Sequence, residues 1–301
     1  MNNNIVKKIK ELKKKKKAII LVHNYQLPEI QDIADYVGDS LELAKISKNL
    51  SAEVIVFCGV HFMAETTKIF NPDKTILMPD LHASCPMANM IDPDRLNSEK
   101  IKYPNAGVVT YINSTAEVKA LSDICCTSAN GIKIARVIDN DEIIFVPDKY
   151  LGSYIAKQVP EKKFYLYNGY CPTHMLFSRE GILKLKKQYP DAQILVHPEC
   201  RTEVQEIADA ICSTSQMISF AKNSPAKKFI ICTEIGLLYR LKKENPDKEF
   251  IPGNPHAICP NMKLTTLEKV LWSLEDMQYP ITIQEEIRLK ALRAIEKMVA
   301  T

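Results

Sequence analysis

Three cysteine–proline steps at nearly equal spacing are the feature that most constrains how this chain can fold. Cys85, Cys171 and Cys259 are separated by 86 and 88 residues, and a proline follows each of them. Such regular spacing is typical of an internal repeat, in which every unit contains the same elements in the same order. The cysteines therefore predict three homologous units of about 87 residues each.

Other residue types recur at matching distances before each cysteine. A His or Tyr closes an apolar run 62, 60 and 62 residues before it, and a Ser or Thr stands 45, 43 and 45 residues before it. In unit order, the recurring residues are His23, Tyr111 and His197; Tyr25, Asn113 and Glu199; Asp35, Asp123 and Asp209; and Ser40, Ser128 and Thr214. We therefore expect domains at residues 1–91, 92–177 and 178–262, followed by a helical tail at 263–301.

Composition narrows the class of protein. The hydrophobic content of 46% and charged content of 25% are typical of soluble globular proteins, and a net charge of +4 over 301 residues gives no support for nucleic-acid binding. No apolar run approaches the roughly 20 residues that span a bilayer, and the lysine-rich N-terminal segment does not resemble a signal peptide. Nine cysteines, an odd number, do not suggest a secreted disulfide framework. We expect a cytoplasmic protein that binds neither membranes nor nucleic acid.

Apolar runs alternate with helical patterns in every unit. The first unit has predicted strands at 18–22, 54–58 and 75–78 and helices at 29–37, 41–50 and 62–70; further strands are predicted at 107–110, 142–146, 163–167, 192–196, 228–232 and 249–251. A helix at 4–17 precedes them, and the tail has two helices, the second opened by a Thr282 to Glu285 capping box. Because strand–helix alternation gives parallel sheets covered on both faces, we predict an α/β fold of three three-layer α/β/α sandwich domains. A pseudo-threefold arrangement would place one active site at their centre.

The recurring residues should lie where ligands bind in such folds. Parallel sheets bind ligands beyond the carboxyl ends of their strands, where the first-strand residues and the cysteine loops both belong. Three thiols make an unusual structural zinc site, which normally takes four ligands. They suit a [4Fe–4S] cluster in which one iron is left open, so that it can bind a substrate oxygen as a Lewis acid. The six other cysteines lie mostly in apolar segments and are expected to be buried thiols.

The remaining recurring side chains favour anion binding and proton transfer. Ser40, Ser128 and Thr214 each precede a helical stretch, where a hydroxyl caps the helix or helps to bind a phosphate or carboxylate. Because three such hydroxyls would face one axis, we favour anion binding. The acid, base and hydrogen-bonding groups at the same edge are His23, Tyr25, Tyr111, Asn113, His197 and Glu199.

Several short motifs resemble those of the quinolinate synthase family, the iron–sulfur enzymes of de novo NAD biosynthesis. The motifs are His23-Asn24-Tyr25, Gly38-Asp39-Ser40, Tyr111-Ile112-Asn113, Thr127-Ser128-Ala129-Asn130, His197-Pro198-Glu199-Cys200, Ser213-Thr214-Ser215 and the three Cys-Pro steps. The resemblance covers nearly the whole chain. It implies three α/β/α domains, a [4Fe–4S] cluster held by Cys85, Cys171 and Cys259, and condensation of iminoaspartate with dihydroxyacetone phosphate to give quinolinate, phosphate and water.

The same resemblance implies roles for the individual residues. Ser40, Ser128 and Thr214 would hold the phosphate or a carboxylate, whereas His23, Tyr111 and Asn113 would orient the dicarboxylate. Tyr25, Glu199 and His197, with His23, would be the catalytic groups that move protons. An L-aspartate oxidase or dehydrogenase would be the functional partner that supplies iminoaspartate.

Two alternatives stay open at the level of sequence. A different [4Fe–4S] hydro-lyase on the same scaffold would act on a small hydroxy acid without dihydroxyacetone phosphate. A non-catalytic anion-binding or electron-carrier protein would leave the open iron and the convergent polar groups without a purpose.

Overall fold

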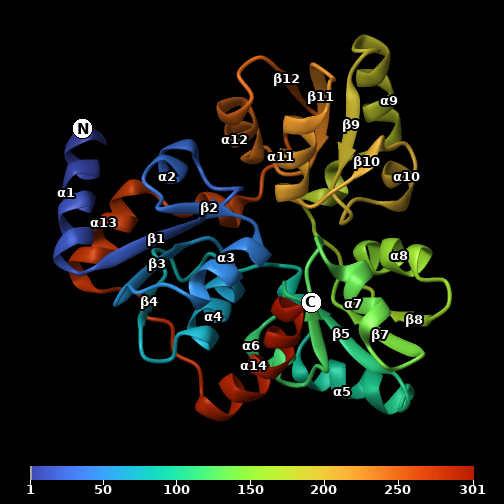
Figure 1. The fold of residues 1–301 in the computed structure, drawn as a ribbon, viewed down its shortest axis with the longest axis horizontal. Helices are drawn as coiled ribbons and strands as arrows, with labels where there is room; N and C mark the ends of the chain where they lie inside the picture. The colour runs from blue at the N-terminus through green and yellow to red at the C-terminus, as the bar shows by residue number, and fades with distance from the viewer. Residues whose placement is uncertain (1) are drawn as a thin grey trace.

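Three separate parallel sheets form the framework of the molecule in the computed structural model, which describes residues 2–301 (Figure 1). Each sheet takes its four strands from one of the three predicted units. The strands are β1 (Ala18–His23), β2 (Tyr36–Gly38), β3 (Val54–Cys58) and β4 (Thr75–Leu77); β5 (Gly107–Tyr111), β6 (Ile124–Cys126), β7 (Glu142–Val146) and β8 (Lys163–Leu166); and β9 (Gln193–Val196), β10 (Ala210–Ile211), β11 (Lys228–Cys232) and β12 (Glu249–Pro252). The predicted α/β class with three repeated units is confirmed, whereas the exact domain boundaries stay a prediction.

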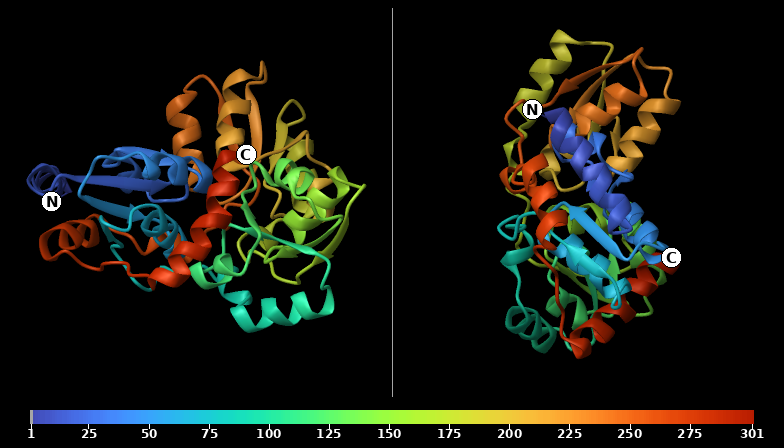
Figure 2. Two further views of the ribbon diagram at one scale, coloured as in Figure 1. Left: turned by 60° about the horizontal axis from the view of Figure 1, so that its bottom comes forward. Right: turned by 90° about the vertical axis from the view of Figure 1, so that its left-hand side faces the viewer.

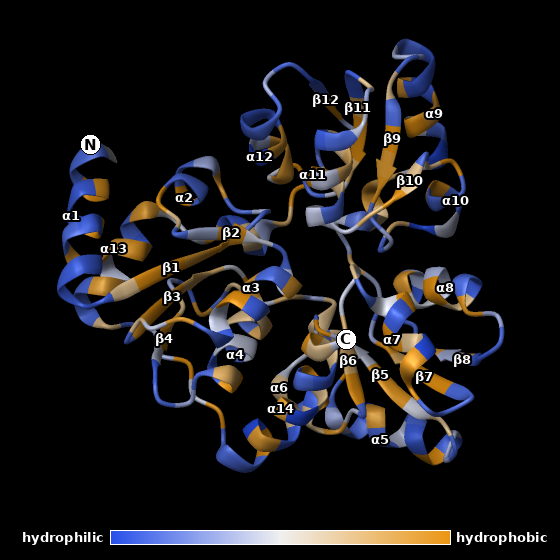
Figure 3. Cartoon of the chain, in the orientation of Figure 1, coloured by the Kyte–Doolittle hydropathy of each residue, from blue (hydrophilic) through white to orange (hydrophobic). Residues whose placement is uncertain are grey.

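The strand order is the same in all three sheets. It is β2-β1-β3-β4 in the first, β6-β5-β7-β8 in the second and β10-β9-β11-β12 in the third, and every pairing within them is parallel. The two central strands of each sheet are apolar runs buried on both faces, as parallel sheets between helices require. Figure 3 shows these strands as the most hydrophobic parts of the chain.

Helices connect the strands and cover the sheets. In the first unit they are α2 (Pro28–Asp32), α3 (Ser40–Lys48) and α4 (His61–Phe70); in the second α5 (Pro93–Lys102), α6 (Ala116–Ala120), α7 (Gly131–Val137) and α8 (Lys149–Gln158); in the third α9 (Arg179–Gln188), α10 (Thr202–Gln205), α11 (Thr214–Asn223) and α12 (Leu237–Glu244). Short 3₁₀ helices η1 (Ala88–Met90), η2 (His174–Leu176) and η3 (Pro260–Lys263) follow the three cysteines. Outside the repeats lie α1 (Asn2–Lys15), α13 (Leu267–Asp276) and α14 (Glu285–Ala300).

The predicted helix at 29–37 is wrong, because that segment is a short helix followed by an edge strand. Helix α2 ends at Asp32, and the chain then turns into β2. The turn is held by Asp35, whose Oδ2 accepts the Ile20 N–H at 2.8 Å and whose own N–H donates to the Ile20 carbonyl at 3.0 Å. The corresponding strands β6 and β10 were not predicted either. Their preceding aspartates, Asp123 and Asp209, make the same contacts to β5 and β9, which explains why an aspartate recurs in every unit.

The two tail helices pack on different units. Helix α13 lies against α1 and β3, whereas α14 lies against α6 and β6 of the second unit and also against α3 and α4 of the first (Figure 2). The predicted capping box at Thr282 is wrong: Gln284 is the N-cap of α14, and it makes no side-chain cap hydrogen bond. The tail therefore joins the first two units through packing. Among the described residues, no helix is both long and apolar enough to cross a membrane.

Candidate active site

One pocket collects every site residue predicted from the sequence. Its lining includes His23, Tyr25, Ser40, Cys85, Tyr111, Asn113, Ser128, Cys171, His197, Glu199, Thr214 and Cys259. These side chains come from all three units and converge because the strand ends and cysteine loops of each unit face the same space. His23 and Tyr111 are the last residues of β1 and β5, and His197 directly follows β9.

The three cysteine loops are built alike. Cys85, Cys171 and Cys259 are half-buried free thiols, and each precedes one of the 3₁₀ helices. Burial raises the pKa of the Cys85 thiol to about 12, even though the backbone N–H groups of the following turn oppose the rise. Burial likewise raises the pKa of Cys171 and Cys259, against hydrogen bonds from the N–H three residues after each sulfur. Each sulfur is thus largely removed from water but already has a backbone donor that would stabilise a thiolate.

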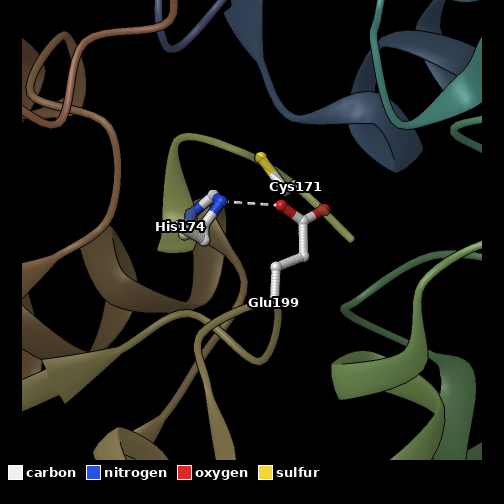
Figure 4. Close-up of side chains that lie close together, drawn as sticks. All are labelled: Cys171, His174 and Glu199. Carbon is white, nitrogen blue, oxygen red and sulfur yellow. Dashed lines mark ion pairs between the residues drawn. The ribbon is translucent and has the colours of Figure 1, made fainter. Parts of the chain in front are cut away.

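Glu199 is the centre of a buried polar cluster (Figure 4). Its Oε1 accepts the Tyr111 hydroxyl at 2.6 Å, and its Oε2 lies 2.8 Å from His174 Nδ1. Burial by itself would raise the pKa of Glu199, but His174, His197 and the Tyr111 hydrogen bond outweigh it and lower that pKa to about 2. Glu199 is therefore ionised at neutral pH and can accept hydrogen bonds.

Two residues of this cluster, His174 and Thr233, were missed by the sequence analysis. The Tyr25 hydroxyl and Thr233 Oγ1 are 2.5 Å apart, and Thr233 Oγ1 is 2.9 Å from His174 Nε2. Together with Glu199 they form a continuous polar chain from Tyr25 to Tyr111. The repeat gave no signal for His174, because the residues three positions after the other cysteines are Ala88 and Met262.

The ionisation of the tyrosine and the histidines follows from burial. Burial, with the charge of Glu199, raises the pKa of Tyr25 well above its ordinary value, so this phenol keeps its proton. Burial lowers the pKa of His23 and of His197 to about 3, so both rings are neutral at neutral pH. Nδ1 of His23 accepts the Tyr25 N–H at 3.2 Å, and Nδ1 of His197 accepts the Glu199 N–H at 3.4 Å. The neutral rings must then carry their proton on Nε2.

The three predicted hydroxyls are not helix caps. Ser40 and Thr214 are the first residues of α3 and α11, whose N-caps are Asp39 and Ser213 in two complete capping boxes. Ser128 lies two residues before Asn130, the N-cap of α7, so it precedes the helix as predicted but does not cap it. Because Asp39 and Ser213 cap α3 and α11, the hydroxyls of Ser40 and Thr214 are not needed as caps, and all three residues line the pocket.

Two polar contacts orient groups in the pocket. Thr214 Oγ1 accepts the Asn24 side-chain amide at 2.9 Å, and Asn24 Oδ1 in turn accepts Arg240 Nη1 at 2.8 Å. The Asn113 amide donates to Glu199 Oε1 at 3.4 Å, while its buried Oδ1 has no hydrogen-bond partner among residues 2–301. A buried acceptor without a donor indicates a place where a ligand binds.

Comparison with known proteins identifies the family. The family described as "Quinolinate synthetase A protein" matches residues 7–300. The chain belongs to the quinolinate synthase family. A curated quinolinate synthase from Thermodesulfovibrio yellowstonii is 54% identical to it over 99% of this chain and 99% of its own length. One from Dehalococcoides mccartyi (strain ATCC BAA-2266 / KCTC 15142 / 195) is 56% identical over 97% of this chain and 96% of its own length. One from Caldicellulosiruptor saccharolyticus is 53% identical over 98% of this chain and 97% of its own. As a quinolinate synthase family member, the chain is an enzyme.

The quinolinate synthase pocket offers two sets of potential metal ligands. Ligand atoms of Cys171, His174 and Glu199 lie within 4.8 Å of one another, close enough for a single ion. The second set consists of the three cysteines, one from each unit. All three thiols line the same pocket. This second set, of three soft sulfur donors, fits a multi-iron cluster.

The six other cysteines do not belong to this set. Cys58, Cys125, Cys126, Cys200, Cys212 and Cys232 are free and buried in strands or beside them, as expected.

Proposed function

We propose that this chain condenses iminoaspartate with dihydroxyacetone phosphate to give quinolinate, with release of phosphate and water, as a step of NAD biosynthesis. Support comes above all from the single pocket lined by all twelve residues that the family resemblance assigns. An L-aspartate oxidase or dehydrogenase would supply iminoaspartate. Nine free cysteines favour a reducing compartment, the cytoplasm, as the location of the enzyme.

Cys85, Cys171 and Cys259 would hold a [4Fe–4S] cluster, whose fourth iron would supply Lewis-acid chemistry when the cluster is bound. Binding requires thiolates, so the amide N–H groups that face the sulfurs would stabilise the bound form. The three cysteines also pack against an apolar cluster.

The remaining residues would bind the substrates and move protons. The hydroxyls of Ser40, Ser128 and Thr214 would hold the phosphate or a carboxylate. Tyr111, Asn113 and neutral His23 would orient the dicarboxylate by hydrogen bonds. Glu199 would accept a proton from the substrates, and Tyr25, which is protonated and contacts Thr233, would donate one. Neutral His197 would shuttle protons beside Glu199.

The reaction is tested by anaerobic incubation of the purified enzyme with dihydroxyacetone phosphate and iminoaspartate, generated from aspartate by an L-aspartate oxidase. Quinolinate and phosphate should form in equal amounts and should require both substrates. Turnover of a hydroxy acid without dihydroxyacetone phosphate would instead support the other hydro-lyase.

Cluster ligation is tested by Cys171→Ala. This variant should lose the brown colour and most of its iron and sulfide, because two thiolates cannot hold the cluster in this pocket. Cys212→Ala, at a buried cysteine outside the pocket lining, is the matched control and should keep both. A normal cluster in Cys171→Ala would contradict the assignment.

A further inference from the structure

The loop that follows the second central strand of each sheet is fastened to the cysteine loop of the same unit. In every unit the residue three positions beyond this strand donates its backbone N–H to the carbonyl two positions before the cysteine. The bonds are His61 to Ala83 at 2.9 Å, Lys149 to Gly169 at 2.9 Å and Ile235 to Ala257 at 3.1 Å. Repeated backbone geometry of this kind makes the neighbouring side chains comparable from unit to unit.

The side chain just before that donor differs between the units. It is Val60 in the first unit, Asp148 in the second and Glu234 in the third, and both carboxylates are fully buried. Asp148 Oδ1 accepts the Leu151 N–H at 2.7 Å and so caps its own helix. The Cys171 N–H also stabilises the ionised form of Asp148, so both carboxylates face the backbone of a predicted cluster ligand. Glu234 differs because it has a lysine partner.

Three donors converge on the Glu234 carboxylate. Its Oε1 accepts the Cys259 N–H at 3.1 Å and lies 2.8 Å from Lys263 Nζ, while its Oε2 accepts the Gly236 N–H at 2.7 Å. Lys263 Nζ also donates to the Tyr25 carbonyl. The pair therefore connects the cysteine loop of the third unit to the Tyr25 loop of the first.

Only an ionised carboxylate satisfies this set of donors. A glutamine would offer one acceptor oxygen and add two N–H groups, leaving at least one buried donor without a partner. A fully buried carboxylate in turn needs its cation, which Lys263 supplies. The loops also meet too closely for a side chain at Gly236, where a Cβ would lie 2.6 Å from the Tyr25 carbonyl oxygen.

Both charges act on the groups around them. After burial, the charge of Glu234 contributes to the raised pKa of Cys259 and of Tyr25. The charge of Lys263 opposes the rise at Cys259 and, after burial, helps to lower the pKa of His23. The two charges therefore have opposite effects at a predicted ligand.

We propose that Glu234 and Lys263 are a positioning pair that couples the Cys259 loop to the Tyr25 loop, and that their two charges move the reduction potential of the cluster in opposite directions. The inference rests on the proposed function, because it requires the cluster. A nearby negative charge disfavours the reduced cluster, which is the more negative state, and a nearby positive charge favours it.

The test is a redox titration of the anaerobically purified holoenzyme at pH 8.5, followed by electron paramagnetic resonance. Glu234→Gln should raise the midpoint potential, because the Lys263 charge is left without its partner. Lys263→Met should lower it, because the positive charge beside the Cys259 loop is removed while the Glu234 carboxylate keeps its hydrogen bonds from the Cys259 and Gly236 N–H groups. Lys263→Arg should restore the wild-type value. Asp247→Asn, which removes a charge from the exposed Lys227–Asp247 pair of the same unit, should leave the potential unchanged.

Positioning has a second readout. Lys263→Met should lower kcat about tenfold with little change in KM, because the Tyr25 loop loses its contact while the binding groups stay in place. Shifts in the same direction for Glu234→Gln and Lys263→Met would overturn the inference. If Glu234→Gln does not retain the cluster, Lys263→Met is sufficient as a test. An unchanged midpoint potential in that variant would overturn the inference. A wild-type enzyme without an iron–sulfur signal would instead refute the proposed function.

Discussion

At the scale of single residues, burial decides the protonation of the pocket. Glu199 is buried yet ionised, because a phenol and two imidazoles surround it, whereas His23 and His197 are buried and neutral. Tyr25 keeps its proton and touches Thr233. The pocket therefore holds an ionised carboxylate and a protonated phenol, linked through Thr233 and His174.

Removing the Tyr25 hydroxyl should separate chemistry from cluster binding. In Tyr25→Phe we expect wild-type iron and sulfide content but a kcat at least about a hundredfold lower, because the proposed proton donor is lost. Tyr239→Phe, which removes a hydroxyl bound to Asp32 outside the pocket lining, is the control and should keep full turnover. Full turnover in Tyr25→Phe would exclude Tyr25 from the mechanism.

The buried histidines should make the fold sensitive to acid. The pKa of His197 is lowered from 6.5 to about 3 in the folded state, so below pH 6.5 the unfolded chain binds a proton that the folded chain does not. The free energy of unfolding should therefore fall as the pH drops from 6.5 towards 3. By pH 5 this histidine should account for about 1–2 kcal/mol.

Urea unfolding of His197→Asn at pH 7 and pH 5, followed by circular dichroism, checks this. The loss of stability between the two values should be about 1–2 kcal/mol smaller than in the wild type. His256→Asn, at an exposed histidine, should lose as much as the wild type. An equal loss in His197→Asn would show that this histidine does not titrate as described.

At the scale of elements, a fully buried lysine joins helix α6 of the second unit to helix α4 of the first. Lys119 Nζ donates to the Ser114 carbonyl at 2.7 Å and to Thr66 Oγ1 at 3.2 Å, and the charge of the buried Glu65 partly offsets the lowering of the Lys119 pKa by burial. Ser114 directly follows Asn113, so this contact also fixes the turn that carries a predicted substrate ligand.

Lys119→Met should destabilise the protein by about 3 kcal/mol, because it leaves the buried Ser114 carbonyl and Thr66 hydroxyl without their charged donor and removes a cation that offsets the buried Glu65. Lys163→Met, which breaks the exposed pair with Glu142, should cost less than about 1 kcal/mol. Chemical denaturation measures both values. If the two variants unfold at the same denaturant concentration, Lys119 does not stabilise this contact between α4 and α6.

At the scale of the whole molecule, the contacts between the units differ in kind. The first and second units share one apolar core with α14, whereas the first and third meet through polar contacts such as Asn24 to Thr214 and Ser215 to Glu42, the latter at 2.6 Å. Residues of all three units line the pocket. Its geometry therefore depends on both kinds of contact between the units.

Ile295→Ala tests the role of α14 in holding the first two units together. Ile295 is fully buried in the shared core, so truncation should cost about 3 kcal/mol and lower the melting temperature. Leu289→Ala, on the exposed side of the same helix, should change stability by less than about 1 kcal/mol. A small effect at Ile295 would mean that α14 contributes little to this interface.

Sequence alone determined the threefold repeat, the α/β class and all twelve predicted pocket residues. This was possible because each unit repeats the same residue types after the same strands, and parallel strands carry such residues to one edge of a sheet. Only the tertiary structure decided the edge strands β2, β6 and β10, which are too short to have a pattern of their own and form by pairing with a neighbouring strand. The tertiary structure alone also decided the contacts of four further residues, His174, Thr233, Glu234 and Lys263. His174, Thr233 and Lys263 each contact a residue of another unit, and Glu234 is linked to the Tyr25 loop through Lys263. Contacts across units depend on three-dimensional packing that no local pattern encodes.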